Sequence, residues 1–234
     1  MGNINLSYVE ENAEENAEIQ KYTLKCTNNS TADWTFYVYQ KMPNQAKEIF
    51  SLAWFASPSK IALGGSHIQF DWTIDYSFVW GRSGIVIPGV DFSAGGEVPC
   101  TPSGDNLTTF GVEDGTPRLS PAVSGGEADI LTVKVASNVP NQTYSAGIGM
   151  SGQGAFAQQA LQNTTQLYTL EPKYYIAAAS SMQSGAVLAQ TINDAKEVKF
   201  PSGVYDLYAS IGEDNQWTIS REPITSEHLC AINE

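Results

Sequence analysis

An alternation of apolar and polar residues with a period of two recurs along this chain, and it constrains the fold more than any other feature. In segment 66–73, Ile68, Phe70 and Trp72 share one face, and the residues between them are polar. Successive side chains of a β-strand point to opposite faces, so the pattern predicts a strand with one buried face. The run 49–56 is apolar almost throughout and predicts a strand buried on both faces.

Turn-forming residues separate about fifteen such segments, at intervals of about 8–15 residues. The clusters at 63–65 (Leu-Gly-Gly) and 201–203 (Pro-Ser-Gly) are typical of these turns. A short helix competes with a strand only at 154–162, where Phe156 and the preceding glycines favour a strand. We therefore predict an all-β fold, a single antiparallel, jelly-roll-like β-sandwich with short strands, and one domain spanning residues 20–234.

The charge balance excludes two classes of partner. The chain has 25 acidic and 12 basic residues, a net charge of −13, and only 16% of its residues are charged. Nucleic-acid binding requires a footprint of Lys and Arg, and adsorption to anionic membranes requires polybasic patches. With 42% apolar residues, among them 5 Trp, 11 Tyr and 9 Phe, the chain has ample material for a core.

The acidic excess is concentrated near the start of the chain. Residues 10–18 read EENAEENAE, with five acids and no base. Glu10, Glu14 and Glu18 are like charges four residues apart, a spacing that destabilises a helix. We predict a flexible acidic arm over residues 1–19. The alternative is a segment that becomes ordered on binding a basic partner.

Targeting and redox signals are weak. The start of the chain lacks a basic segment followed by an apolar run, so no secretory signal peptide is predicted. No stretch approaches 18 apolar residues, so no membrane span is predicted, and the expected location is the cytoplasm or outside the cell without a signal peptide. Cys26, Cys100 and Cys230 are widely spaced and odd in number, which favours reduced, structural thiols.

Three strings that begin within residues 34–80 resemble the RhiA-like family, named after a rhizosphere-expressed protein of root-nodule bacteria. The second and third strings contain Trp, which is a rare residue. Their Trp spacing is therefore fairly specific to this family. The resemblance covers roughly residues 34–170 and does not include the acidic arm. It rests on FYVYQKMP, SLAWFA and IQFDWTIDYSFVWGRSG, with continuations IVIPGVDF at 85–92 and YSAGIGMSGQGAF at 144–156.

This resemblance implies a bacterial protein expressed under quorum-sensing control. It implies no mechanism, because the family has no established activity and no catalytic residues to carry over. Function has to be argued from the residues themselves.

Catalytic and metal-binding patterns are sparse. The two histidines are His67 and His228. Asp71 follows His67 on the same strand face, but four residues along a strand span about 13 Å, too far for a catalytic triad. His228-Leu229-Cys230 offers two soft ligands, short of a zinc site. We predict no catalytic residue, no metal and no cofactor, with an enzyme using Asp71 and Asp75 as an alternative.

Aromatic density is the strongest remaining feature. Tyr37 and Tyr39 share the strand face opposite Trp34 and Phe36. If that face is open, it forms a platform suited to sugars or other flat ligands; if it is covered, it belongs to a core or an interface. The predicted ligand-binding residues are Tyr37, Tyr39, Asp71, Trp72, Asp75 and Tyr76.

Together these features predict a non-enzymatic protein that binds a neutral ligand or partner, such as a glycan, through an aromatic surface. A homo-oligomer is compatible with the same surface. A second hypothesis is a self-assembling or pore-forming secreted factor that uses the amphipathic strands of 144–170.

Overall fold

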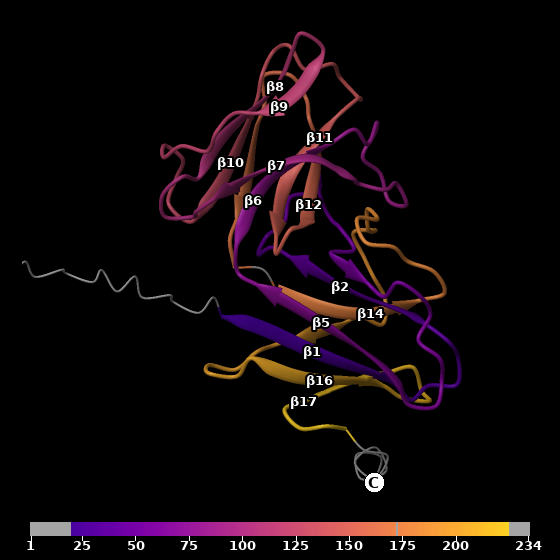
Figure 1. Cartoon of the computed structure of the whole chain (residues 1–234). Coiled ribbons are helices and arrows are strands. Elements are labelled where there is room, and N and C mark those ends of the chain that lie inside the picture. Colours follow the sequence, from indigo (N-terminus) through magenta and orange to yellow (C-terminus); the bar gives the residue numbers. More distant parts are fainter. Residues whose placement is uncertain (1–19, 172, 225–234) are drawn as a thin grey trace, which may run out of the picture.

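The computed structural model describes residues 20–171 and 173–224. All regular secondary structure within these residues is β-strand (Figure 1). The predicted all-β fold is therefore confirmed. Segment 154–162, where a helix competed with a strand, holds most of β12 (Gln153–Gln159). The predicted acidic arm, residues 1–19, lies outside the described residues.

The strands of this part of the chain form four sheets. Sheet I has the order β17-β16-β1-β5, with β1 (Lys21–Asn28), β5 (Ser66–Thr73), β16 (Asp206–Ile211) and β17 (Trp217–Ser220). Sheet II has the order β15-β14-β2-β4, with β2 (Thr35–Lys41), β4 (Phe55–Ala56), β14 (Lys173–Ala179) and β15 (Lys196–Val198). Sheet III has the order β3-β12-β11-β6-β7, with β3 (Ile49–Ser51), β6 (Tyr76–Gly81), β7 (Ala94–Cys100), β11 (Ser145–Met150) and β12. Sheet IV has the order β13-β10-β8-β9, with β8 (Leu107–Glu113), β9 (Thr116–Leu119), β10 (Ile130–Val135) and β13 (Thr165–Thr169).

The four sheets pack as two stacked sandwiches. Sheets I and II form the lower half of Figure 1, where Phe36 and Trp217 meet with ring centroids 4.9 Å apart. Sheets III and IV form the upper half, where the rings of Trp80 and Phe110 lie 5.8 Å apart. Trp72 is 1% exposed, so the predicted inward face of 66–73 is confirmed.

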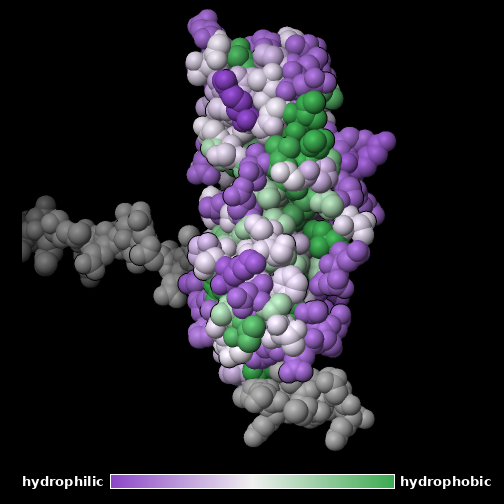
Figure 2. Space-filling view, turned by 90° about the vertical axis from the view of Figure 1, so that its right-hand side faces the viewer, coloured by the Kyte–Doolittle hydropathy of each residue, from purple (hydrophilic) through white to green (hydrophobic). Residues whose placement is uncertain are grey.

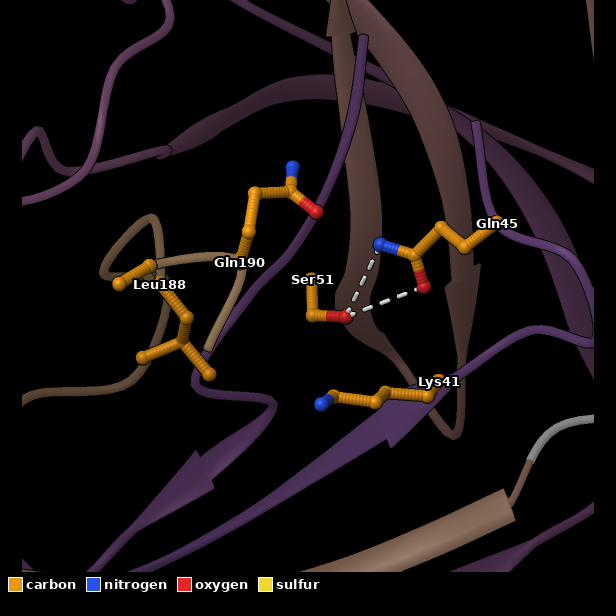
Figure 3. A pocket seen from close by; sticks show the side chains of 6 residues that line it. Lys41, Gln45, Ser51, Leu188 and Gln190 are labelled. Carbon is orange, nitrogen blue, oxygen red and sulfur yellow. Dashed lines mark hydrogen bonds between the residues drawn. The ribbon is translucent and has the colours of Figure 1, made fainter. Parts of the chain in front are cut away.

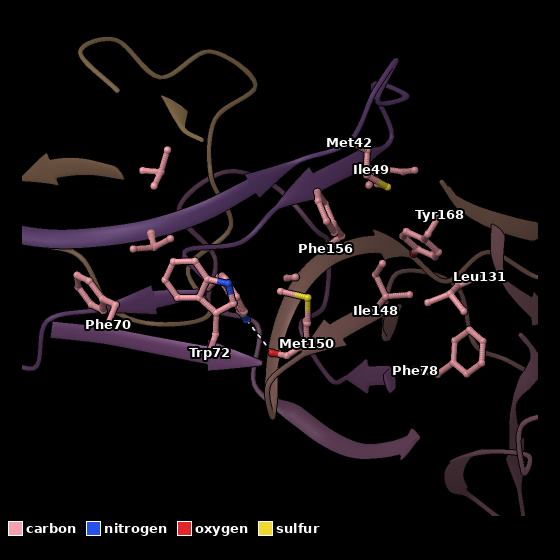
Figure 4. Close-up of a cluster of buried hydrophobic side chains, with 14 of the residues drawn as sticks. Met42, Ile49, Phe70, Trp72, Phe78, Leu131, Ile148, Met150, Phe156 and Tyr168 are labelled. Carbon is pink, nitrogen blue, oxygen red and sulfur yellow. Dashed lines mark hydrogen bonds between the residues drawn. The ribbon is translucent and has the colours of Figure 1, made fainter. Parts of the chain in front are cut away.

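One buried cluster runs through both sandwiches. Figure 4 shows it extending from Trp72 in sheet I to Leu131 in sheet IV. Trp54 joins the two halves, because its indole N–H donates a 2.8 Å hydrogen bond to the carbonyl of Met150. The prediction of a single domain over 20–234 is compatible with this shared core and stays a prediction.

A single antiparallel jelly-roll sandwich is not confirmed, because four separate sheets are present and two strand pairs are parallel. β1 runs parallel to β16, and β8 runs parallel to β10. The predicted strand over 49–56 is also wrong as one unit: β3 belongs to sheet III and β4 to sheet II. Alternation determines which way a strand's side chains point, but it does not select the strand's partner.

Residues 180–195, the strap, lie between β14 and β15 and appear on the right of Figure 1. On one side of the strap, the Ala53 N–H donates to the Ala186 carbonyl at 2.8 Å. On its other side, the Phe92 N–H donates to the Gly185 carbonyl at 2.9 Å. Two isolated antiparallel bridges, Leu52 with Val187 and Asp91 with Ala186, therefore tie the strap to the chain after β3 and to the segment 89–92.

These bridges place the strap between the two edges of sheet III. Phe92 leads directly into β7, which is the opposite edge strand of the same sheet. A buried hydrophobic cluster joins the strap to sheet III and the loop before β7: Leu52, Val79, Val86, Phe92, Ala157 and Val187. The strap is thus built into the hydrophobic core of sheet III as well as lying against sheet II.

Candidate functional site

The outer face of sheet II carries a row of tyrosines. Tyr37 and Tyr39 project from β2, and their rings stack with centroids 6.1 Å apart. Tyr175 stands opposite Tyr39 on β14, and these two rings are 5.2 Å apart. The period-two pattern of the strand explains this row, because Phe36 and Val38 point the other way into the core.

The strap covers this tyrosine row. Tyr37 is 4% exposed and Tyr39 is 1% exposed, and both belong to one buried cluster with Ala186 and Leu188 of the strap. The sequence left open whether this face was open or covered, and the structure shows that a later segment of the same chain covers it. Burial raises the pKa of Tyr37 to about 12. The hydroxyl therefore stays protonated at neutral pH and is able to donate a hydrogen bond.

A groove of about 820 Å³ lies between the strap and the loop before β7; we call it the strap groove. It opens on the side of the molecule where the strap lies, and Figure 2 shows hydrophobic side chains gathered among polar ones on this side. Ile85 and Ile87, in the same loop, are about half exposed. The groove is lined by Tyr37, Pro88, Gly89, Asp91, Ser181, Met182, Gln183, Ala186, Val187, Leu188, Ala189, Thr191 and Ile192.

The lining of the strap groove is chemically mixed but nearly uncharged. Pro88, Met182 and Ile192 offer apolar surface, while hydroxyl and amide groups come from serine, threonine and glutamine. Asp91 is the one charged residue in the lining. Apart from Tyr37, sequence reasoning missed these residues, because no local pattern indicates that 181–192 folds back against 88–91.

A second, smaller cavity of about 110 Å³ lies at the other end of the tyrosine row; we call it the Lys41 recess (Figure 3). Lys41 places its ammonium 5.9 Å from the ring centroid of Tyr39 and 5.5 Å from that of Tyr175. Leu188 and Ala189 of the strap line both cavities and therefore lie between them. The full lining of the recess is Lys41, Gln45, Ser51, Leu188, Ala189 and Gln190.

Trp72 lies apart from the tyrosine row. It points from β5 into the core between sheets I and II, where its ring is 5.3 Å from Tyr174 and 5.4 Å from Trp54. Tyr37 faces away from that core. The structure therefore does not bring Trp72 together with Tyr37 on one surface.

Asp71 lies on the outer face of sheet I. Its carboxylate is 3.1 Å from the ammonium of Lys21 and accepts a 3.0 Å hydrogen bond from the Thr23 hydroxyl. Partial burial by itself would raise the pKa of Asp71, but hydrogen bonds from Gln69, Lys21 and Thr23 lower it below its ordinary value. The carboxylate is therefore ionised and paired on the surface.

Asp75 and Tyr76 lie where the chain passes from sheet I to sheet III. Asp75 is exposed and accepts a hydrogen bond from the Thr73 hydroxyl. Tyr76 is partly buried, and burial, followed by the nearby Cys100, raises its pKa to about 12. The six predicted ligand-binding residues therefore do not form one site, and only Tyr37 of them lines the strap groove.

A family model described as RhiA matches residues 19–222 of this chain. The chain belongs to the RhiA family. Protein RhiA from Rhizobium leguminosarum bv. viciae is 46% identical over 205 residues, which cover 87% of this chain and 88% of the relative. No solved structure matches the chain.

The predicted resemblance to RhiA-like proteins is thus confirmed, and the match is longer than the 34–170 inferred from the strings. It extends from β1 to β17 and includes both walls of the strap groove, whereas residues 1–18 fall outside it. In the described part of this RhiA-family chain, no helix is long and apolar enough to cross a membrane. The same residues contain no cluster of three or more potential metal ligands.

Proposed function

We propose that this RhiA-family chain is a non-enzymatic binding protein that takes a neutral ligand, such as a glycan, in the strap groove. The observation that carries the proposal is a groove of about 820 Å³ with Asp91 as its one charged lining residue. Ligand sites commonly occupy about 300–1,000 Å³ and combine apolar walls with a few polar groups. Both properties fit the strap groove.

The lining suits a molecule with one apolar and one hydroxylated face. Met182 and Ile192 provide apolar surface on the strap, and Pro88 provides it on the opposite wall. Thr191 adds a hydroxyl, and the protonated phenol of Tyr37 adds a donor at the base. A neutral ligand loses less hydration energy on entry than a charged one, so these few polar contacts are sufficient for binding.

The proposal keeps two of the predicted ligand-binding residues. Tyr37 contacts the ligand, and Tyr39 supports Tyr37 through ring stacking. Asp71, Trp72, Asp75 and Tyr76 do not line the groove and have no part in this mode of binding. The enzymatic alternative gains no support from Asp71, because that carboxylate is engaged with Lys21 and Thr23.

The other predictions have their own tests. Self-assembly or pore formation predicts leakage from liposomes, although β11, within 144–170, is central in sheet III and all its residues are buried. Oligomerisation predicts a solution mass that is a multiple of the chain's 25.3 kDa. Quorum-sensing control, which rests on the resemblance, predicts that transcript levels rise with cell density.

The binding proposal is tested by screening the full chain against a glycan array and, by thermal shift, against a library of neutral small molecules. Thr191 is exposed and lines the groove, so Thr191→Trp should block entry. Thr169→Trp is a matched control, because Thr169 is an exposed threonine on the edge strand β13. We expect a hit whose affinity falls by about tenfold or more in Thr191→Trp and is unchanged in Thr169→Trp.

Tyr37→Phe provides a finer probe, since it removes one hydroxyl and retains the ring. Loss of a single hydrogen bond predicts an affinity reduced by roughly three- to tenfold for a hydroxylated ligand. A hit that binds Thr191→Trp and the wild type with equal affinity would place the ligand outside the groove. The absence of any hit in both screens would also count against the proposal.

A further inference from the structure

Two lysines stand opposite each other at the Lys41 end of the tyrosine row. Lys41 on β2 pairs in register with Lys173 on β14, so both side chains leave the same face of sheet II. Directly opposite residues of an antiparallel pair have Cβ atoms roughly 4.5–5.5 Å apart. Like charges at this spacing repel each other unless a counter-charge lies near them.

Neither lysine forms an ion pair within the described residues; Glu197 of β15, which stands opposite Tyr175, is instead paired with Lys199. The four ion pairs of these residues join Lys21 to Asp71, Lys47 to Glu48, Arg118 to Glu113 and Lys199 to Glu197, leaving Lys41 and Lys173 without a partner. The chain as a whole has a net charge of −13 and only 12 basic residues. Among these few cations, Lys41 and Lys173 are the two that a strand register places directly opposite each other.

The Lys41 ammonium is held in place but its hydrogen-bonding capacity is unused. The rings of Tyr39 and Tyr175 attract it through their π faces. Within the described residues, its N–H groups have no hydrogen-bond acceptor. An ammonium group has three donors, so those of Lys41 are available to a bound group.

The walls of the Lys41 recess are preorganised around this cation. The Gln45 amide donates to the Ile49 carbonyl at 2.9 Å, and the Gln190 amide donates to the Lys47 carbonyl at 3.2 Å. Figure 3 shows these two side chains and Ser51 arranged around the cavity above Lys41. The recess has a volume of about 110 Å³, several times the roughly 10–15 Å³ that one water needs on this measure, so it has room for a small polar group.

We propose that the Lys41 recess is an anion subsite that takes a carboxylate, sulfate or phosphate group. The bound oxyanion accepts hydrogen bonds from Lys41 and neutralises the repulsion between Lys41 and Lys173. The strap, through Leu188 and Ala189, forms the apolar wall of the subsite. This subsite is separate from the strap groove and does not depend on what the groove binds.

The test is calorimetric titration of the full chain with sodium phosphate, sulfate and acetate, with sodium chloride at matched ionic strength as the blank. Saturable binding near one ion per chain is expected for at least one of the three. Charged hydrogen bonds predict that Lys41→Gln weakens this binding by about tenfold or more, whereas Lys41→Arg retains it. A response to acetate alone identifies a carboxylate subsite, and a response to phosphate or sulfate identifies a tetrahedral-oxyanion subsite.

Lys47→Gln is the matched control, because the Lys47 side chain is 90% exposed and already lies 3.8 Å from Glu48. It should leave ion binding unchanged. Sulfate and phosphate also act on proteins without binding, because they are excluded from the surface. Lys41→Gln does not remove this general effect, so a loss of affinity in that variant reports binding in the recess. The proposal is overturned if no ion shows saturable binding, if Lys41→Gln binds like the wild type, or if Lys47→Gln loses as much affinity.

Discussion

Replacing Gly185 with alanine tests whether backbone hydrogen bonds hold the strap in place. Gly185 has a φ of +86°, and a Cβ on it would lie 2.3 Å from the carbonyl oxygen of Phe92. No side chain fits at that distance, so the strap and the segment 89–92 must separate. The separation weakens two hydrogen bonds between these segments, from the Phe92 N–H to the Gly185 carbonyl at 2.9 Å and from the Val187 N–H to the Val90 carbonyl at 2.8 Å.

Gly203 provides a matched control for the magnitude. Its φ is +75°, but a Cβ there meets no atom within 4 Å. A positive φ costs alanine about 1 kcal/mol at either position. Gly185→Ala loses two further hydrogen bonds at about 1 kcal/mol each. We therefore expect destabilisation of about 3 kcal/mol for Gly185→Ala and about 1 kcal/mol for Gly203→Ala.

The assay is urea unfolding followed by tryptophan fluorescence, with the free energy of unfolding taken from linear extrapolation. Hydrogen exchange adds a local readout: the amides of Phe92 and Val187 should exchange faster in Gly185→Ala, and their exchange should be unchanged in Gly203→Ala. Equal losses of stability in the two variants, or exchange at these amides that is unaffected, would refute the idea that these bonds hold the strap.

Three further predictions concern charge, the joint between the sandwiches and pH. Lys173→Gln should raise the free energy of unfolding by about 0.2–1 kcal/mol at low salt, because it relieves repulsion from Lys41, and a gain that persists in 1 M salt would contradict this cause. Trp54→Phe leaves the carbonyl of Met150 without its donor and should cost about 1–3 kcal/mol in urea unfolding; no loss would mean that this bond contributes little. The pKa of Tyr37 is about 12 in the folded protein and about 10 when unfolded, so the unfolded state loses its proton first and stability should fall as pH rises from about 10 to about 12. Urea unfolding across this range should show a shallower fall for Tyr37→Phe, and an unchanged slope would contradict the assignment.

The faces of the strands were readable from the sequence because they depend on local backbone geometry. Phe70 and Trp72 face inward as their alternation predicts, and Tyr37 lies opposite Phe36. The RhiA family was also recognisable from short tryptophan-rich strings, since these are fairly specific. The number of sheets was not readable from the sequence. The two residues between β5 and β6 carry the chain from sheet I to sheet III without any change in periodicity.

By itself, the sequence determined that the protein is all-β, that its side chains alternate between buried and exposed faces, and that the family is RhiA. Only the tertiary structure decided what lies against each face. The strap reaches Tyr37 from more than 140 positions later in the chain, and it pairs with Ala53 and Phe92 through backbone groups that carry no side-chain signal. Pairing over such separations depends on the packing of the whole chain rather than on local pattern, so both the strap groove and the Lys41 recess became visible only in the folded protein.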